Sequence, residues 1–255
     1  MSLVAFAIRV AAVRTLREAL PSGFEVLDSP QEPMDRLDCA SPAPFVAVYT
    51  GHNETEIDAR EMLGGKSKVD LAIQFVLPAS LTFPLSGGGS ITLDTRKQGA
   101  ETALDVLWRR AACAFDAGAS PWASLWREFV INTPKIVNAS YLIEVKTVRA
   151  VAREVVVSCE PIHEPVPGAA PEGAWAALVE LMRADQASDG LAGLADWLEA
   201  EIAGPAELTQ AQRDAAYLGL SAYAAENVAI LEVASDVGNI PDVTAQIEVM
   251  AEGEG

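Results

Sequence analysis

The sequence has few basic residues, and this scarcity limits what the protein can bind. Its 255 residues include 18 lysines and arginines against 36 aspartates and glutamates, which gives a formal net charge of -18 at pH 7. A surface of this sign repels nucleic acid phosphates, so sequence-specific binding to DNA or RNA is not expected. The same charge suits a wall past which DNA moves without adhering.

The chain also lacks paired cysteines and long apolar runs. Cys39, Cys113 and Cys159 are widely spaced with no CxxC motif, which predicts free thiols in a reducing compartment. The N-terminus does not read as a secretory signal, because Arg9 and Arg14 follow the apolar residues and no small-residue cleavage site closes the run. No stretch approaches the roughly 18 apolar residues of a bilayer span. We expect a protein made in the cytoplasm, without a membrane partner.

No motif in the sequence has the residues and spacing that a nucleotide site or a metal site requires. Gly64–Ser67 matches the end of a phosphate-binding loop, but Arg60 occupies the position of the required first glycine and a strand is expected next. The two histidines, His52 and His163, lack neighbours at metal-ligand spacing. The acidic residues between 54 and 61 lack the spacing of a calcium loop. The sequence therefore predicts neither a cofactor nor a metal.

A catalytic thiol is equally unsupported. Cys159 and His163 could in principle form a thiolate pair, yet Cys159 ends an apolar strand, where an inert buried thiol is the common case. We expect a structural protein, not an enzyme. The alternative hypothesis, from the class of enzymes, is a small cytoplasmic enzyme whose acidic loop lines a cleft.

Periodicity does indicate a fold. Residues 68–77 alternate strictly between apolar and polar, which predicts a half-buried antiparallel strand. Residues 3–20 repeat apolar positions at spacings of three and four, which predicts an amphipathic helix. Between them we expect a proline-rich crossing loop over 28–44, a short strand at 45–49 and a polar hairpin or flap over 50–67.

The rest of the chain predicts further elements on either side of a proline-rich linker at 161–171. We interpret 1–165 as one α/β (α+β) domain with a mixed or antiparallel sheet flanked by helices, and 166–255 as a helical extension ending in a β-hairpin. The remaining expected elements are a strand around Ile91 and Leu93, a helix over 97–116, two strands within 141–160, helices over 173–186, 190–203 and 207–225, and strands over 228–233 and 243–250.

Two groups of residues are candidates for contacts between subunits. One comprises polar residues of the expected flap and of the polar face of the alternating strand. The other comprises tryptophans from an aromatic cluster that we divide between core and interface, since tryptophan is enriched at interfaces. The candidate subunit-interface residues are Glu54, Glu56, Asp58, Lys68, Asp70, Gln74, Trp122 and Trp126.

The order of elements over residues 1–165 resembles the phage tail terminator family, also called tail completion proteins. The segments that carry the resemblance are the opening helix VAFAIRVAAVRTLREAL, the crossing DSPxxP, the strand PFVAVY, the alternating strand KVDLAIQFVL and the later strand RAVAREVVVSCEP.

The resemblance implies an α/β subunit that forms a hexameric ring at the head-proximal end of the tail of a virion. Such a ring ends polymerisation of the tail tube, contacts the tube protein and a head-completion or neck protein, and lets DNA pass through its lumen. Another head-to-tail connector or stopper is the alternative within this class. The segment after Pro171 has no counterpart in the family pattern.

Overall fold

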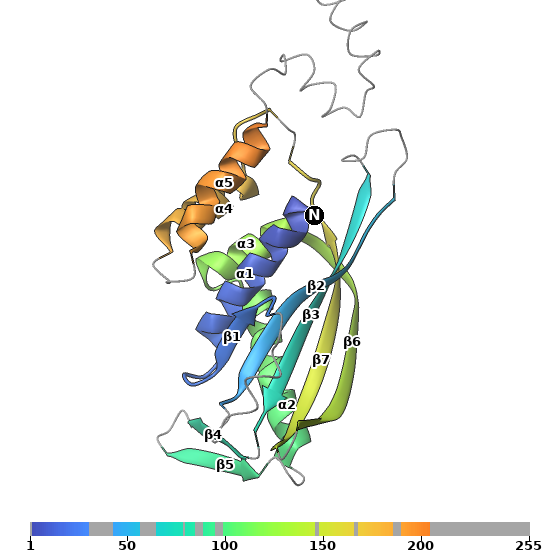
Figure 1. The fold of residues 1–255 in the computed structure, drawn as a ribbon, viewed down its shortest axis with the longest axis vertical. Helices are drawn as coiled ribbons and strands as arrows, with labels where there is room; N and C mark the ends of the chain where they lie inside the picture. Colours follow the sequence, from blue (N-terminus) through green and yellow to red (C-terminus); the bar gives the residue numbers. More distant parts are fainter. Residues whose placement is uncertain are drawn as a thin grey trace, which may run out of the picture.

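A computed structural model describes residues 2–30, 43–56, 65–78, 80–84, 89–94, 99–145, 148–165, 168–185 and 190–204. The helix expected over 207–225 and the two strands expected after it lie outside these ranges. The described residues form an α+β fold in which a mixed five-stranded sheet is flanked by helices, as the sequence predicts (Figure 1). None of the described helices combines the length and the apolarity that a membrane span requires.

The sheet contains five strands in the order β1-β2-β3-β7-β6. Strand β1 is parallel to β2, and every other pairing is antiparallel. A separate pair, β4 and β5, forms a small antiparallel hairpin. The strand bounds are Glu25–Asp28 for β1, Phe45–Glu56 for β2, Lys66–Leu77 for β3, Ser80–Pro84 for β4, Ser90–Asp94 for β5, Val130–Val145 for β6 and Val148–Pro161 for β7.

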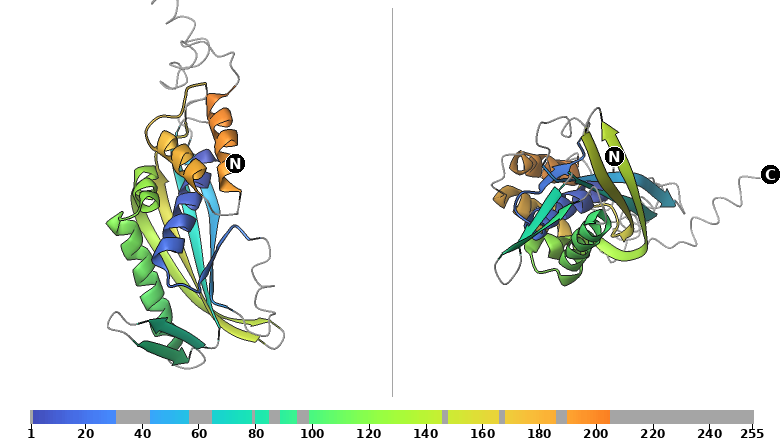
Figure 2. Two further views of the ribbon diagram at one scale, coloured as in Figure 1. Left: turned by 90° about the vertical axis from the view of Figure 1, so that its left-hand side faces the viewer. Right: turned by 90° about the horizontal axis from the view of Figure 1, so that it is seen from below.

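The alternating strand lies at the centre of this sheet, as β3. Its apolar residues Val69, Leu71, Ile73, Phe75 and Leu77 are all fully buried, which confirms the predicted inward face. They pack under three helices, α1 (Leu3–Ala19), α2 (Gly99–Ala117) and α3 (Pro121–Phe129), which lie on one side of the sheet (Figure 2). A smaller apolar cluster, around Phe45 and Val76, lies on the opposite face of the sheet.

The helix ends follow ordinary capping chemistry. The Ser2 hydroxyl accepts a hydrogen bond from Ala5 N at the start of α1, and the Glu164 carboxylate accepts from Leu3 N at 3.2 Å and Val4 N at 3.3 Å. These acceptors satisfy N–H groups that have no partner within the helix. Helix α1 is thereby fastened to the segment that follows β7.

The described part of the extension belongs to the same hydrophobic core as the rest. Helices α4 (Ala174–Ala184) and α5 (Leu191–Ala203) match the expected 173–186 and 190–203, and their buried side chains join the cluster beneath α1 and α3. The Trp175 ring meets the Phe129 ring edge-on at 4.9 Å between centroids. At the end of α4, Asp185 forms a largely buried ion pair with Arg14 of α1 at 2.5 Å. Helices α4 and α5 therefore extend the first core and do not build a second one.

Candidate subunit interface

Strand β6 is the longest strand of the sheet, and it lies at an edge. It runs over 16 residues, Val130–Val145, and pairs on one side with β7. Register shifts occur between Val130 and Lys135, near Pro134. Proline cannot donate to a ladder and is tolerated at sheet edges and bulges, so its position agrees with an edge strand.

The exposed apolar side chains of the described residues concentrate on this strand. Leu142 is 74% exposed and Ile131 70%, and three more large apolar side chains of β6 are at least 37% exposed, namely Ile136, Val137 and Tyr141. A long edge strand with apolar side chains and unpaired backbone groups is a template for another chain, and most proteins cover or blunt such an edge. β6 therefore has the chemistry of a contact surface.

The apolar residues of β6 lie on both faces of the sheet. Ile136 and Leu142 pair with Val157 and Val151, which contribute to the core on the helix side. Val137 and Tyr141 have the opposite parity along the strand and so point to the other face. A partner must therefore contact the edge from both sides.

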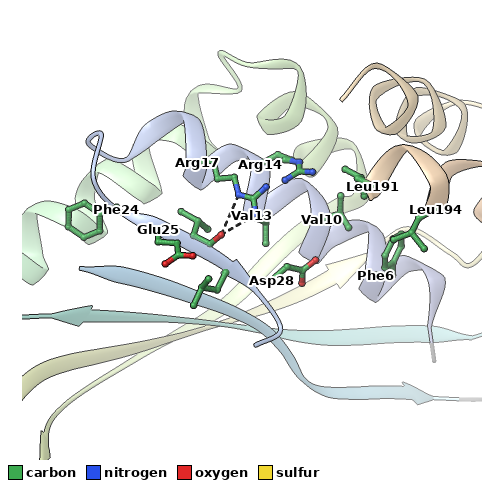
Figure 3. A pocket seen from close by; sticks show the side chains of 12 residues that line it. Phe6, Val10, Val13, Arg14, Arg17, Phe24, Glu25, Asp28, Leu191 and Leu194 are labelled. Carbon is green, nitrogen blue, oxygen red and sulfur yellow. Dashed lines mark hydrogen bonds between the residues drawn. The ribbon is translucent and has the colours of Figure 1, made fainter. Parts of the chain in front are cut away.

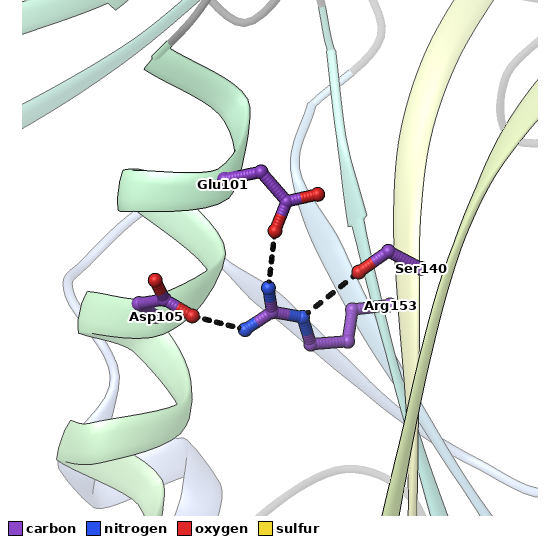
Figure 4. Close-up of polar contacts among 4 residues, drawn as sticks. All are labelled: Glu101, Asp105, Ser140 and Arg153. Atoms are coloured by element: carbon purple, nitrogen blue, oxygen red, sulfur yellow. Dashed lines mark hydrogen bonds and ion pairs between the residues drawn. The ribbon is translucent and has the colours of Figure 1, made fainter.

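An arginine cluster holds the middle of β6 against helix α2 (Figure 4). Arg153 of β7 is 7% exposed, and its guanidinium donates to Glu101 Oε2 and Asp105 Oδ1, both at 2.6 Å. Its Nε donates to the hydroxyl of Ser140 on β6 at 3.1 Å. The fork of the guanidinium allows one side chain to make these contacts in fixed directions, so Arg153 links Ser140 of β6 to helix α2.

The opposite edge of the sheet is arranged differently. Strand β1 has only four residues, and Arg17 of α1 donates to the Val26 carbonyl from Nε at 3.3 Å and from Nη2 at 3.1 Å (Figure 3). Glu25 N bonds to Pro44 O, on the β2 side, so Val26 has its backbone groups turned outward. Arg9 also pairs with Asp28 at 2.6 Å. We call β1 the closed edge and β6 the open edge.

A pocket of about 560 Å³ lies between α1, β1 and α5, beside the closed edge (Figure 3). Its wall is apolar apart from four charged residues, and three of these make contacts within the subunit: Arg14 with Asp185, Arg17 with the Val26 carbonyl, and Asp28 with Arg9. These contacts join α1 to the edge strand and to α4. The charged groups of the pocket therefore have structural partners.

The acidic candidates Glu54 and Glu56 lie at the end of the β2–β3 hairpin and are exposed. They stand opposite Lys68 and Lys66 in the register, and opposite charges in such cross-strand positions stabilise a hairpin. Gly65 precedes β3 and has a φ of 132°, which residues other than glycine rarely adopt. A Cβ at this position would also lie 2.2 Å from the Glu56 carbonyl oxygen, so only glycine fits. Strand β3 therefore begins directly after Gly65, at Lys66.

The polar face of β3 is partly occupied by neighbours in its own sheet. Asp70 accepts a hydrogen bond from the Ser158 hydroxyl at 2.6 Å, and the Gln74 amide donates to the hydroxyl of Tyr141 on β6. Lys68 is exposed, whereas Asp70 and Gln74 are half-buried. Asp58 lies outside the described residues. Among these candidates, Gln74 is the one that contacts the open edge.

The assignment of Trp122 and Trp126 to a subunit interface requires correction. Both side chains are only 8% exposed and belong to the core of their own subunit, and the Trp126 ring lies 4.7 Å from that of Phe115. The reason is the helix they occupy: Ser120 caps α3 and Pro121 begins it, and both tryptophans lie on the apolar side of this amphipathic helix, which is buried in the core. The exposed tryptophan of the described chain is Trp197 on α5.

The buried thiol of Cys159 is a poor nucleophile. Burial, with a smaller contribution from the charge of Asp70, raises the pKa of Cys159 to about 12. A thiol nucleophile needs a lowered pKa, so the pairing of Cys159 with His163 gains no support. Within the described ranges no three His, Cys, Asp or Glu side chains gather as a metal site would require.

Sequence patterns miss most of the open edge. In this part of the chain the sequence predicts strands only within 141–160, whereas β6 begins at Val130. Asn132, Pro134 and Asn138 have low strand propensity and interrupt the alternation that marks a half-buried strand. The usable signal was the proline itself, because a proline inside a run that is otherwise strand-like indicates an edge.

Neither the models of known protein families nor the curated proteins contain a match to this chain.

Proposed function

We propose that this protein is a structural component of a tailed phage virion, a tail terminator that forms a ring at the head-proximal end of the tail tube. The observation that carries the proposal is the open edge, since a ring subunit needs a surface that contacts its neighbour. Five large apolar side chains are exposed there, on both faces of one strand. The element order that resembles tail terminators supports the same function.

The charge of the chain supports this proposal. A ring at the end of a tail tube surrounds the path of DNA, and a formal charge of -18 gives DNA no basic surface to adhere to. Head-to-tail contacts between identical subunits close into a ring when the rotation between neighbours is correct. In this role the ring partners are the tail tube protein on one side and a head-completion or neck protein on the other.

The test is electron microscopy of the purified full-length protein, alone and mixed with growing tail tubes. We expect closed rings of uniform size, and tubes that stop lengthening with a ring on one end. Tubes that grow to the same length distribution with and without the protein would contradict the proposal. Binding only to the head side of an isolated neck would reassign the protein to a stopper.

A further inference from the structure

We infer that the contact between neighbouring subunits is heterologous: the open edge of one copy packs against helix α5 of the next copy. This inference rests on the proposed ring and names the surfaces that build it. It concerns a second copy of this chain and no other partner.

The first argument is the distribution of exposed apolar side chains. In the described part of the chain, seven of the eight large apolar side chains that are substantially exposed lie on two elements, five on β6 and two on α5. The two on α5 are Leu194, at 42%, and Trp197, at 49%. A tryptophan with half of its surface in water is costly to leave uncovered, and tryptophan is the residue most enriched at energetically dominant contact positions.

The second argument is geometry. α5 and β1 line the same pocket, so α5 lies beside the closed edge, and β1 and β6 are the two ends of the sheet. Figure 1 and the right panel of Figure 2 show α5 and β6 on opposite sides of the molecule. Two different apolar surfaces on opposite sides are what a head-to-tail contact requires, because each copy then offers one surface to each neighbour.

The third argument is charge. Two copies of a chain with a formal charge of -18 repel each other over most of their surfaces. β6 carries one lysine, Lys135, and one glutamate, Glu144, whereas α5 carries three acidic residues and no basic one, although two of the three, Asp196 and Glu199, pair with Arg183 of α4. Lys135 is exposed beside Ile136 and Val137, so the open edge offers one positive charge to α5, whose three carboxylates outnumber the single paired charge of Arg183. An edge-to-edge contact of β6 with β6 would leave Trp197 in water.

The experiment uses three full-length variants that each place a glutamate at an exposed apolar position. Leu142→Glu alters the open edge, Trp197→Glu alters α5, and Val106→Glu on α2 is the matched control, since Val106 is 37% exposed and belongs to neither surface. Size by sedimentation is measured for each protein and for an equimolar mixture of the first two. Thermal midpoints close to that of the wild type establish that every variant is folded.

We expect rings for the wild type and for Val106→Glu, and monomers for Leu142→Glu and for Trp197→Glu, whose dissociation constants should each rise by about 100-fold or more. The mixture should form a one-to-one dimer and no ring, because the intact β6 of one variant meets the intact α5 of the other. Rings that persist in either variant would overturn the inference. A dimer of Trp197→Glu on its own would instead indicate contact of β6 with β6.

The outcomes also separate this inference from the proposed function. If the variants behave as expected but the rings do not stop tube growth, the subunit contact stands and the tail terminator function fails. If Leu142→Glu still caps tubes as efficiently as the wild type, the function stands and the contact fails. A wild type that remains monomeric at every concentration contradicts both.

Discussion

The two edges of the sheet solve the same physical problem in opposite ways. An edge strand exposes unpaired N–H and C=O groups, and these groups either find partners within the subunit or remain available to another chain. At β1 the strand is four residues long and Arg17 takes the outward carbonyl of Val26. At β6 the strand is 16 residues long and adds apolar side chains on both faces. Exposed apolar side chains and an unoccupied strand edge therefore occur together at β6, whereas the described residues of the same sheet cover the edge at β1.

The largest expected effect concerns how α4 and α5 are held beside the closed edge. Trp175→Ala should lower the free energy of unfolding by about 3–5 kcal/mol, since it removes a buried ring that packs on Phe129 and leaves a cavity. Urea denaturation measures the change. Trp197→Ala is the matched control in the monomer, and its half-exposed ring should cost less than about 0.5 kcal/mol. Equal losses for the two tryptophans would contradict this account of α5.

The arginine cluster behind the open edge should have the next largest effect. Arg153→Ala removes charged hydrogen bonds to Glu101, Asp105 and Ser140, and we expect a loss of about 1–2 kcal/mol because both carboxylates are more than half exposed. The comparison is Arg109→Ala on the exposed surface of α2. If both substitutions changed the urea midpoint equally, Arg153 would have no special part in holding β6.

A smaller effect should follow from opening the closed edge. Arg17→Ala removes both donors to the Val26 carbonyl, which should cost about 1 kcal/mol of local stability. Hydrogen exchange of the β1 amides should then be roughly fivefold faster, with β6 unchanged. Unchanged exchange at β1 would show that Arg17 does not protect this edge.

The smallest expected effect concerns the charged rim of the open edge. Lys135→Glu should weaken association by less than about tenfold at moderate salt, because exposed charges are worth at most about 1 kcal/mol. The loss should shrink further as salt is raised, since exposed charges are screened. Sedimentation across a salt series measures it. A loss that does not depend on salt would mean that Lys135 acts through packing and not through charge.

The sequence predicted the parts of this fold that depend on periodicity. The alternation of residues 68–77 predicted the face and the antiparallel pairing of β3, and the apolar spacing of residues 3–20 predicted α1 to within one residue. β1 was not predicted, because four residues are too few to show a period and its pairing depends on β2 and on Arg17.

The candidate interface was less predictable, and Trp122 and Trp126 show why. Composition marks tryptophan as an interface residue, yet whether a given ring faces water depends on how α3 is oriented by its cap and its neighbours. Trp197 lies off the apolar stripe of its helix, formed by Leu191, Ala195, Leu198 and Ile202, whereas Trp175 lies on the stripe of α4, so helical spacing separates the two tryptophans where composition does not. Apart from the signal of Pro134, the open edge follows from the order of the strands in the sheet, which depends on pairings between distant segments.

Hydrogen exchange of the wild-type protein at low and at high concentration compares the two edges most directly. We predict that amides of β6 become markedly more protected as concentration rises and subunits associate, while amides of β1 exchange at the same rate throughout. Exchange at β6 that stays constant while sedimentation shows larger assemblies would contradict the claim that the open edge is the contact between copies.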